Sequence, residues 1–428
     1  MEKTKIGNYR WVICSLLFFA TTINYIDRQV IGLLKPTLEK EFHWTEIDYG
    51  YIVMAFAAMY ALGYVVFGTF IDKVGTKIGY AVSVGIWSIA AIVHAFAKST
   101  LGFGIARGLL GLSEAGNFPA GVKAVAEWFP TKERALATGI FNSGTSIGAV
   151  VAPIIVPWVL GMYGWKEAFW ITGSLGFVWL IFWWIFYEIP SKQKRVKQPE
   201  LDYIQNNEII IESETLVKLK WSQLLGLRQT WVFIVGKVLT DPIWWFFLFW
   251  LPSYFADTFA LDLTKPSLHL AVVYAATTFG SIGGGYLSSY FIKIGWPVLK
   301  ARKTTLLIVA IAVTPIFFAQ FTSNIWVAVA IISVATAAHQ AWSANIFTIV
   351  SDMFPKRAVS TVVGIGGMSG SIASTLFPII VGSLLAYYKG LGNIAAGYNV
   401  LFIISGCAYF LAWIIIQLLT RKMKSVEL

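Results

Sequence analysis

Seven ionisable side chains stand inside long apolar stretches of the sequence, and their types are the ones that could do chemistry there. They are Asp27, Arg28, Arg107, Glu114, Lys123, Lys237 and Asp241. A charge at the centre of a bilayer costs about 3 kcal/mol or more, so such residues are kept chiefly where they function. Carboxylates can carry protons and guanidiniums can hold anions.

The spacing within one of these stretches places an acid and a base on one side of a helix. Arg107 and Glu114 are seven residues apart, which is two helical turns, or roughly 10 Å along the axis. Glu114 can gain and lose a proton, whereas Arg107 stays charged and can hold an anion. Asp27 and Arg28 repeat this combination. We expect the two acids to couple protons and the two arginines to bind an anionic substrate.

Burial disfavours the charged form of a carboxylate, and a nearby guanidinium favours it. A substrate carboxylate that takes over an arginine would therefore free the acid to accept a proton. The alternative interpretation is that Asp27 with Arg28, and Arg107 with Glu114, form structural ion pairs that hold two helices together.

Lys237 and Asp241 are four residues apart, so they lie on one face of a helix. They are candidates for substrate binding, and a pair that only satisfies itself is about equally compatible with the spacing. Pro242 follows directly and is expected to bend the helix.

Polar and aromatic side chains accompany these charges and could bind a polyol or stack on its ring. Those in the candidate substrate site are Tyr25, Tyr60, Asn117, Thr145, His339, Gln340, Trp342 and Asn345, with Asn24, Asn142, Trp244, Trp245 and Ser343 nearby. Aromatic residues in membrane proteins also serve as packing and interface residues, and that alternative must hold for most of the 19 tryptophans.

The elements that position these residues follow from composition. Of 428 residues, 57% are hydrophobic and 13% are charged, which is too apolar for a soluble protein of this size. Apolar stretches long enough to cross a bilayer recur along the chain. We predict an all-α integral membrane protein with twelve spans, at residues 11–33, 47–71, 77–97, 101–124, 135–161, 166–187, 230–256, 268–292, 303–322, 324–350, 358–386 and 396–419.

The placement of basic residues predicts the orientation. Most of the 33 lysines and arginines fall in loops that share one side if both termini are cytoplasmic, which is the positive-inside pattern. We therefore attribute the net charge of +11 to membrane orientation and to contacts with lipid headgroups. We expect no nucleic-acid partner. The first apolar stretch is long and lacks a cleavage site, so we interpret it as a span rather than a signal peptide.

Several classes of chemistry have no support in the sequence. The two cysteines, Cys14 and Cys407, lie in apolar stretches and are expected to be buried hydrophobes. No nucleotide-binding loop, metal-ligand cluster or Ser/His/Asp arrangement is visible. We therefore expect neither an enzyme nor a bound metal or cofactor.

The longest polar interval divides the chain into two halves. Residues 189–228 form a predicted cytoplasmic linker between bundles at 1–188 and 229–428, and the segment Lys218–Leu227 is weakly amphipathic. Glycines cluster at 144–148 and 280–285, which would let helices approach closely.

A polar loop follows the second span and reads GTFIDKVGTK over residues 68–77. It matches the G-x-x-x-D-[KR]-x-G-x-[RK] loop of the major facilitator superfamily, and we expect Gly68, Asp72, Lys73 and Gly75 to form a conformational latch between the halves. Residues 285–295 resemble a degenerate copy with Ser289 in place of the aspartate. The latch should therefore be asymmetric.

Longer motifs resemble the anion:cation symporter family of this superfamily, and within it the bacterial hexuronate transporters. They are VGTKIGYA at 74–81, ARGLLGLSEAGNFPAG at 106–121, LTDPIWWFFLFWLPSYF at 239–255 and AHQAWSANIFTIVSDMFPKRAVSTVVGIGGMSGSIAS at 338–374. The resemblance implies a fold of two pseudo-symmetric six-helix bundles, a monomer, and a place in the bacterial inner membrane.

The same resemblance implies roles for individual residues. Asp27 and Glu114 match proton-coupling acids, Arg28 and Arg107 match residues that serve the substrate carboxylate, and a tyrosine pair matches Tyr25 and Tyr60. Thr145 departs from some galactonate-type relatives, which place a longer amide there. The implied function is proton-coupled import of galacturonate or glucuronate by alternating access, with galactonate or another organic anion, or proton-driven efflux, as the rivals.

Overall fold

The computed structural model describes residues 6–44, 46–205, 221–261 and 267–420, and every regular element within these ranges is a helix. The helices of the first half are α1 (Tyr9–Phe42), α2 (Glu46–Val74), α3 (Thr76–Val93), η1 (His94–Phe96), α4 (Thr100–Glu114), α5 (Asn117–Trp128), α6 (Thr131–Met162) and α7 (Trp165–Phe186). The linker contributes η2 (Pro190–Lys192), α8 (Gln198–Gln205) and α9 (Trp221–Leu225). The second half contains α10 (Arg228–Phe249), α11 (Leu251–Phe259), α12 (Leu268–Lys293), α13 (Val298–Val313), η3 (Thr314–Phe321), α14 (Ile325–Met353), α15 (Lys356–Gly390) and α16 (Ile394–Leu419).

Local signals explain where several helices begin. The side chains of Ser99, Ser267, Asn324 and Asn393 each accept a hydrogen bond from a backbone N–H in the first turn of α4, α12, α14 and α16. Such caps satisfy N–H groups that have no partner within the helix. Gly75 separates α2 from α3 with a φ of +86°, a conformation that favours glycine.

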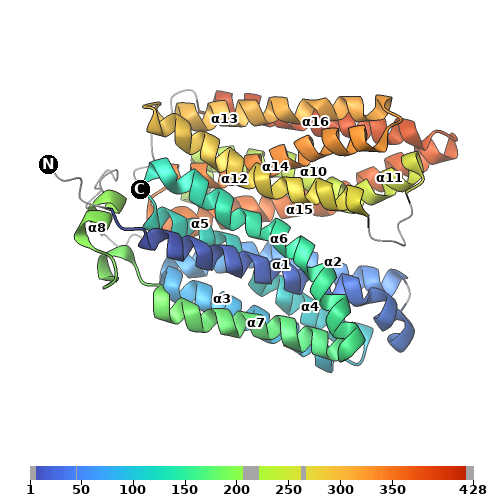
Figure 1. The fold of residues 1–428 in the computed structure, drawn as a ribbon, viewed down its shortest axis with the longest axis horizontal. Helices are drawn as coiled ribbons and strands as arrows, with labels where there is room; N and C mark the ends of the chain where they lie inside the picture. Colours follow the sequence, from blue (N-terminus) through green and yellow to red (C-terminus); the bar gives the residue numbers. More distant parts are fainter. Residues whose placement is uncertain (1–5, 45, 206–220, 262–266, 421–428) are drawn as a thin grey trace.

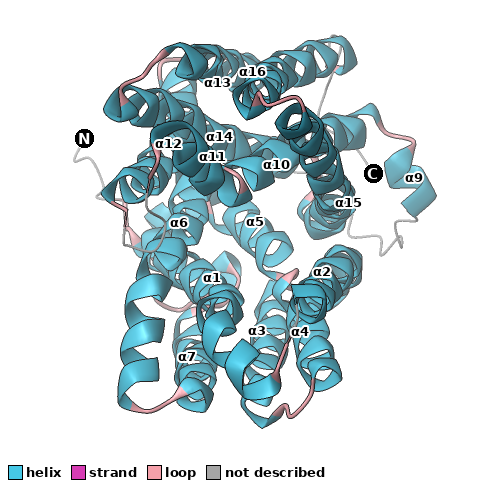
Figure 2. Ribbon diagram, turned by 90° about the vertical axis from the view of Figure 1, so that its right-hand side faces the viewer, coloured by secondary structure: helices cyan, strands magenta, loops and turns pink. Residues whose placement is uncertain are grey.

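The helices form two groups that lie side by side (Figure 1). Helices α1 to α7 make the first group, in which α1 packs on α6, α2 on α4 and α3 on α7. Helices α10 to α16 make the second, in which α12 packs on α14 and α10 on α15. Helices α6 with α12, and α2 with α15, form the main contacts between the groups, and the view along the helices shows both groups end on (Figure 2).

Ten of the described helices are long and apolar enough to cross a membrane. Each of the twelve predicted spans overlaps a helix or a pair of consecutive helices. The two that are not among the ten are α1 and the α4–α5 pair. Helix α4 ends at Glu114 and α5 starts at Asn117, so the predicted fourth span is broken near its middle. These two segments carry Asp27, Arg28, Arg107 and Glu114.

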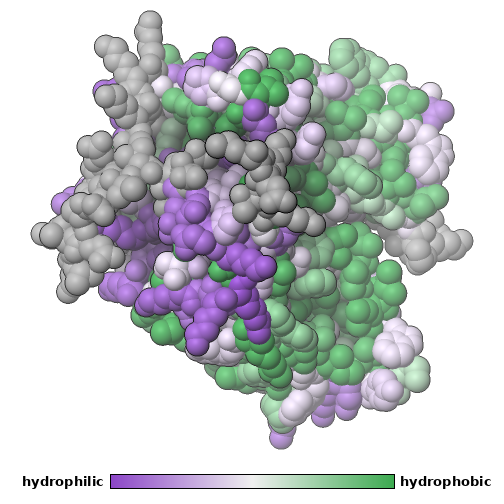
Figure 3. All heavy atoms as spheres, turned by 60° about the vertical axis from the view of Figure 1, so that its left-hand side comes forward, coloured by the Kyte–Doolittle hydropathy of each residue, from purple (hydrophilic) through white to green (hydrophobic). Residues whose placement is uncertain are grey.

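The surface separates polar from apolar regions. Hydrophilic residues gather at the end that carries α8, and hydrophobic residues cover the sides of the helices (Figure 3). Large apolar side chains such as Leu101, Phe279 and Phe321 are more than two-thirds exposed, as expected for side chains in contact with lipid. Helix α9 covers Trp221–Leu225 of the predicted amphipathic segment, and residues 218–220 lie outside the described ranges.

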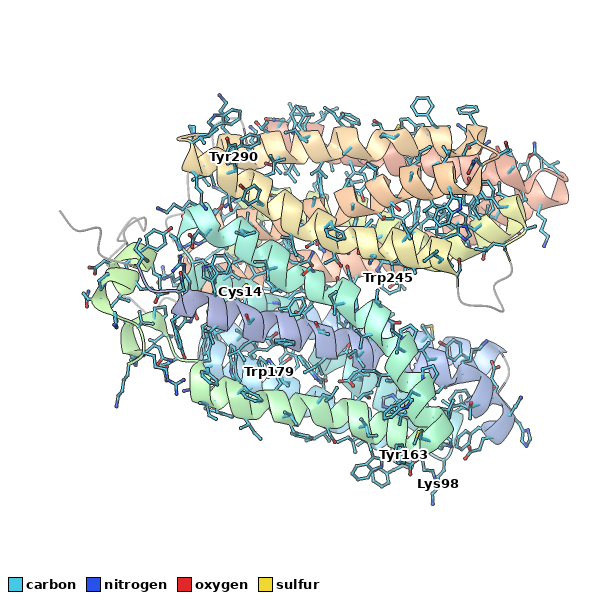
Figure 4. All side chains as sticks on the ribbon, in the orientation of Figure 1. Cys14, Lys98, Tyr163, Trp179, Trp245 and Tyr290 are labelled. Atoms are coloured by element: carbon cyan, nitrogen blue, oxygen red, sulfur yellow. The ribbon has the colours of Figure 1, made fainter. Side chains whose placement is uncertain are left out.

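The core of the first group is aromatic and buried. Trp179 of α7 donates from its indole nitrogen to the backbone oxygen of Leu16 in α1 (2.8 Å), which ties these helices together (Figure 4). Cys14 is buried as expected, with its sulfur 3.6 Å from the backbone oxygen of Ala137, whereas Cys407 of α16 is exposed, so the expectation that both are buried is wrong for Cys407. Lys98 and Tyr163 mark the opposite end of this group from α8 (Figure 4).

Candidate functional site

The side chain of Arg28 is the centre of the charged site. It extends from α1, and its Nε donates to Oε2 of Glu114 at 3.0 Å. Its Nη2 donates to Oδ1 of Asn24, one helical turn away, at 3.3 Å. The Arg28 side chain is 19% exposed and that of Glu114 is fully buried. The guanidinium is therefore the accessible member of a buried ion pair.

Aromatic rings surround this guanidinium. Its central carbon lies 4.6 Å from the ring centres of Tyr25 and Tyr60 and 5.1 Å from that of Phe56. The guanidinium of Arg107 lies 4.6 Å from the same Phe56 ring. Ring faces attract cations, so Phe56 helps to hold two like charges in one small volume. Sequence reasoning did not identify Phe56, because its type is common throughout the chain.

Several polar atoms in this cluster have no hydrogen-bond partner within the described parts of the chain. They are both carboxylate oxygens of Asp27, Nε and Nη1 of Arg107, and Oε1 of Glu114. All three residues are at most 5% exposed. Nη2 of Arg107 donates to the backbone oxygen of Arg28 at 2.5 Å. Buried polar atoms are normally satisfied, so this concentration marks a place where another group is expected to bind.

Lys237 and Asp241 of α10 form a direct ion pair in the second half. Nζ of Lys237 lies 2.8 Å from Oδ2 of Asp241, and the side chains are 9% and 20% exposed. The ammonium also lies 4.6 Å from the ring centre of Phe347. The predicted i, i+4 contact is present, and the lysine charge is compensated within its own helix.

Three predicted site residues of α14 have partners inside the second half. Nδ1 of His339 lies 2.6 Å from the hydroxyl of Tyr409, and the imidazole stacks on Trp244 with ring centres 5.0 Å apart. The indole of Trp342 donates to a backbone oxygen of α10 at 3.4 Å. The amide of Asn345 donates to backbone oxygens of α12 and α14 at 3.0 and 2.9 Å. His339 and Trp342 thus have partners within their own half, whereas Oδ1 of Asn345 has no partner in the described residues.

The neighbouring Gln340 joins the halves instead. Its side-chain oxygen accepts a hydrogen bond from the Asn142 amide of α6 at 2.9 Å, and the same amide lies 2.9 Å from the hydroxyl of Ser281 in α12. One turn further along α6, Thr145 is buried, and its hydroxyl has no partner in the described residues.

Asn117 lies at the start of α5 and is fully buried. Its side-chain oxygen accepts from the hydroxyl of Tyr80, and its amide donates to the hydroxyl of Thr21 at 3.2 Å. Both of these contacts are within the first group of helices. Asn117 therefore supports the turn that ends α4 at Glu114.

The latch motif lies where α2 meets α15. Asp72 accepts from Nζ of Lys123 at 2.8 Å and from the backbone N–H and hydroxyl of Thr361 at 2.6 and 2.7 Å. A Cβ on Gly68 would come within 2.6 Å of the Ser360 backbone oxygen, so only glycine allows this approach. Asp72 thus bridges an ion pair of the first half to the first turns of a helix in the second.

The other two latch residues have different surroundings. Lys73 is exposed at the last turn of α2. Gly75 supplies the positive φ that starts α3. Of the four latch residues, Gly68 and Asp72 are thus the ones that contact the second half in this conformation.

A second set of charges across the halves was missed by sequence reasoning. Arg134 donates to the backbone oxygen of Ser351 at 2.8 Å, and Arg302 contacts Asp352 at 2.9 Å and the backbone oxygen of Thr131 at 3.0 Å. The sequence does hold a signal for this set, a four-residue motif in which an acidic residue is followed by any residue, then Phe, then Pro. It occurs at residues 127–130 and 352–355.

No group of three or more His, Cys, Asp or Glu side chains in the described ranges could hold a metal ion. The chemistry available at the site is thus that of guanidiniums, carboxyls, hydroxyls and rings. It suits an anion with hydroxyl groups, and a proton that moves with it.

Comparisons with known proteins agree with this fold. The chain resembles the solved proton:xylose symporter XylE bound to 6-bromo-6-deoxy-D-glucose, with a TM-score of 0.72 and 15% identity over 95% of this chain and 94% of that one. At that identity the likeness shows the fold alone. A family model described as Major Facilitator Superfamily matches residues 17–378.

Two relatives are closer in sequence. The hexuronate transporter of Escherichia coli strain K12 is 37% identical over 383 residues, which cover 89% of this chain and 88% of that protein. The galacturonate transporter of Dickeya chrysanthemi is 35% identical over 290 residues, which cover 68% of this chain and 84% of that one. The chain therefore belongs to the major facilitator superfamily and is a multi-pass transporter of the bacterial inner membrane, not an enzyme.

Proposed function

We propose that this transporter imports a hexuronate, such as galacturonate or glucuronate, together with protons. The observation that carries the proposal is the accessible Arg28 guanidinium, ion-paired at 3.0 Å to a fully buried Glu114 and surrounded by rings. The sugar acids named for the two relatives support the choice of substrate.

The ion pair suggests how an anion and a proton move together. A uronate carboxylate that binds Arg28 competes directly with Glu114 for the guanidinium. Glu114 then loses its charged partner in a fully buried position, and an unpaired buried carboxylate is strongly disfavoured. Binding of a proton to Glu114 removes that cost. Substrate and proton binding therefore favour each other, which is the condition for symport.

Asp27 and Arg107 form the second acid–base combination in the proposed mechanism. Two guanidinium nitrogens of Arg107, Nε and Nη1, have no acceptor among the described residues, so Arg107 can bind a substrate oxygen without giving up an existing bond. Asp27 makes no hydrogen bond of normal geometry in the same ranges, and the hydroxyl beside it is that of Thr172. We assign Asp27 as the second proton carrier.

Hydroxyl groups of the sugar need donors and acceptors near the arginines. We propose that Tyr25 and Tyr60 contact the sugar, that Thr145 supplies a hydroxyl, and that Gln340 contacts the ligand from the second half. Asn117, His339 and Trp342 are engaged with their own half, and we assign them to packing. Asn345 is anchored through its amide nitrogen, and we propose that its unpartnered oxygen can accept from a sugar hydroxyl.

Transport requires that the site open to one side at a time. We propose twelve spans with both termini in the cytoplasm and rocking of the halves 1–188 and 229–428 around the site. The contacts made by Asp72, Arg134 and Arg302 then close the cytoplasmic side, and the present conformation faces outward. Import begins with a uronate that enters from the outside.

Uptake into proteoliposomes tests the proposal directly. Purified protein should concentrate labelled galacturonate when an inward proton gradient is imposed, and Arg107→Ala should abolish this uptake. Excess glucuronate should compete better than excess galactonate. Wild-type protein that accumulates no hexuronate under the gradient would contradict the proposed function, and stronger competition by galactonate would assign the site to aldonates.

A further inference from the structure

The Lys237–Asp241 pair lies where the two halves meet. The Lys237 ammonium faces the ring of Phe347, and that ring stacks on Phe118 of α5 with centres 5.0 Å apart and planes at 9°. Phe118 belongs to the first half. The pair is therefore held next to an aromatic contact that joins the halves.

Close packing on α15 places the pair near the arginine site. A Cβ on Gly370 would come within 2.5 Å of Oδ2 of Asp241, and one on Gly367 within 2.5 Å of the Tyr64 ring. Positions three residues apart lie on one helix face. Asp241 and Tyr64 thus contact neighbouring points of the same face of α15.

Tyr64 in turn contacts the arginine site. The hydroxyl of Tyr60 donates to that of Tyr64 at 3.3 Å, and the Tyr60 ring lies 4.6 Å from the Arg28 guanidinium carbon. The path from Arg28 therefore runs through Tyr60 and Tyr64 to the face of α15 against which Asp241 also lies. A sugar acid bound by Arg28 can extend toward this pair.

Both ends of this path hold an ion pair, Arg28 with Glu114 and Lys237 with Asp241, but the arginine end has a second cation, Arg107, against the same Phe56 ring. Arg107 has unpartnered N–H groups in the described residues, whereas the Lys237 charge is neutralised by Asp241 at 2.8 Å. An ammonium has three donors and a carboxylate has two oxygens, so the pair keeps donors and an acceptor for hydroxyl groups. A second carboxylate on the ligand would be repelled by Asp241 and would have to displace Asp241 from Lys237.

We propose that the Lys237–Asp241 pair makes the transporter selective for sugar acids with one carboxylate and excludes dicarboxylates of the same length. This inference rests on the proposed function, because it takes a uronate carboxylate to bind at Arg28. Asp241 acts here as the specificity-determining residue, since it neutralises the cation that a second carboxylate would need.

Competition against galacturonate uptake tests the inference. The two competitors are glucuronate, with one carboxylate, and galactarate, with two. For wild type, galactarate should inhibit at least ~10-fold more weakly than glucuronate. Asp241→Asn leaves the Lys237 charge free and should reduce this difference by ~10-fold or more. The double variant Lys237→Met with Asp241→Asn has no free charge and should restore the weak inhibition.

Each outcome decides one claim. Equal inhibition of wild type by both acids, an unchanged ratio in Asp241→Asn, or galactarate inhibition that persists in the double variant would overturn the role of the pair. Ligand-induced thermal stabilisation of each purified protein gives a second readout that needs no transport. Wild type that neither takes up galacturonate nor is stabilised by it contradicts the proposed function, whereas galactarate stabilisation specific to Asp241→Asn still supports the pair.

Discussion

In the first half, Asp27, Arg107 and Glu114 keep buried polar atoms without a partner among the described residues. In the second half, the charged pair Lys237 and Asp241 satisfy each other at 2.8 Å, and His339 is held by Tyr409 at 2.6 Å. The unpartnered buried atoms described there, such as Oδ1 of Asn345, belong to neutral side chains. Groups that are fully satisfied have little to gain from a ligand, whereas unsatisfied groups gain a partner. The comparison therefore supports the proposal that the carboxylate and the proton bind in the first half, and that the second half contributes packing and recognition of hydroxyls.

The largest effect is expected from Arg28→Lys. Lysine keeps the charge but cannot donate to Glu114 and Asn24 from one planar group while it lies among three rings. Uptake of galacturonate should fall by ~100-fold, which corresponds to about 2.7 kcal/mol. Arg195→Lys, in the exposed linker, is the matched control and should keep normal uptake. If Arg28→Lys bound galacturonate with normal affinity, carboxylate binding could no longer be assigned to the first half.

Asp72→Asn tests a satisfied ion pair of the first half. The Asp72 and Lys123 side chains are 7% and 6% exposed, and a buried charge that loses its partner is destabilising. We expect a loss of about 2 kcal/mol in the free energy of unfolding, measured by thermal or denaturant unfolding in detergent. Adding Lys123→Met should recover much of this loss, because no charge is then left unpaired. Additive losses in the double variant would show that the pair is not coupled.

Tyr409→Phe tests the packing role of His339. Removal of one hydroxyl leaves the imidazole without its partner at Nδ1, which should cost about 1 kcal/mol of stability. Galacturonate affinity should stay within a few-fold of wild type. A large loss of affinity at unchanged stability would return His339 to the substrate site.

The smallest effect is expected at the surface, where Lys77 donates to Glu188 at 2.9 Å. This hydrogen bond lowers the pKa of Glu188 below its ordinary value of 4.5. The pair therefore contributes its stability above about pH 4.5 and loses it as the pH falls through the lower folded value. Because solvent screens the pair, Glu188→Gln should change stability by less than about 1 kcal/mol at neutral pH. If Glu188→Gln lowered the free energy of unfolding as much as Asp72→Asn, burial would not determine how strongly these ion pairs stabilise the protein.

Sequence patterns predicted the helices well because apolar length and periodicity are local properties. Each predicted span overlaps a helix, and the seven-residue spacing of Arg107 and Glu114 brings both to the buried cluster. The patterns did not predict the break between Glu114 and Asn117, because glycine and asparagine are tolerated within membrane helices. They also did not show which polar side chains already have hydrogen-bond or ion-pair partners within the protein.

Contacts between residues distant in sequence explain which candidate residues already have partners and which residues sequence reasoning missed. Asn117 is bonded by Tyr80 of α3, and His339 by Tyr409 of α16. Both partners are distant in sequence, so no local pattern shows whether a polar side chain is free. Arg134 and Arg302 were overlooked because basic residues near helix ends also serve as topology signals. Their partners across the halves are revealed only by the fold.

The exchange of labelled galacturonate across proteoliposomes loaded with unlabelled galacturonate tests the role of Glu114 most directly. Exchange needs substrate binding and movement of the halves but no net proton transfer. Accumulation under an imposed proton gradient needs binding, movement and net proton transfer. Glu114→Gln should retain exchange and lose gradient-driven accumulation, because glutamine imitates the protonated acid but cannot release a proton. If Glu114→Gln still concentrates galacturonate in response to the proton gradient, then Glu114 does not couple protons, and its contact with Arg28 is a structural ion pair.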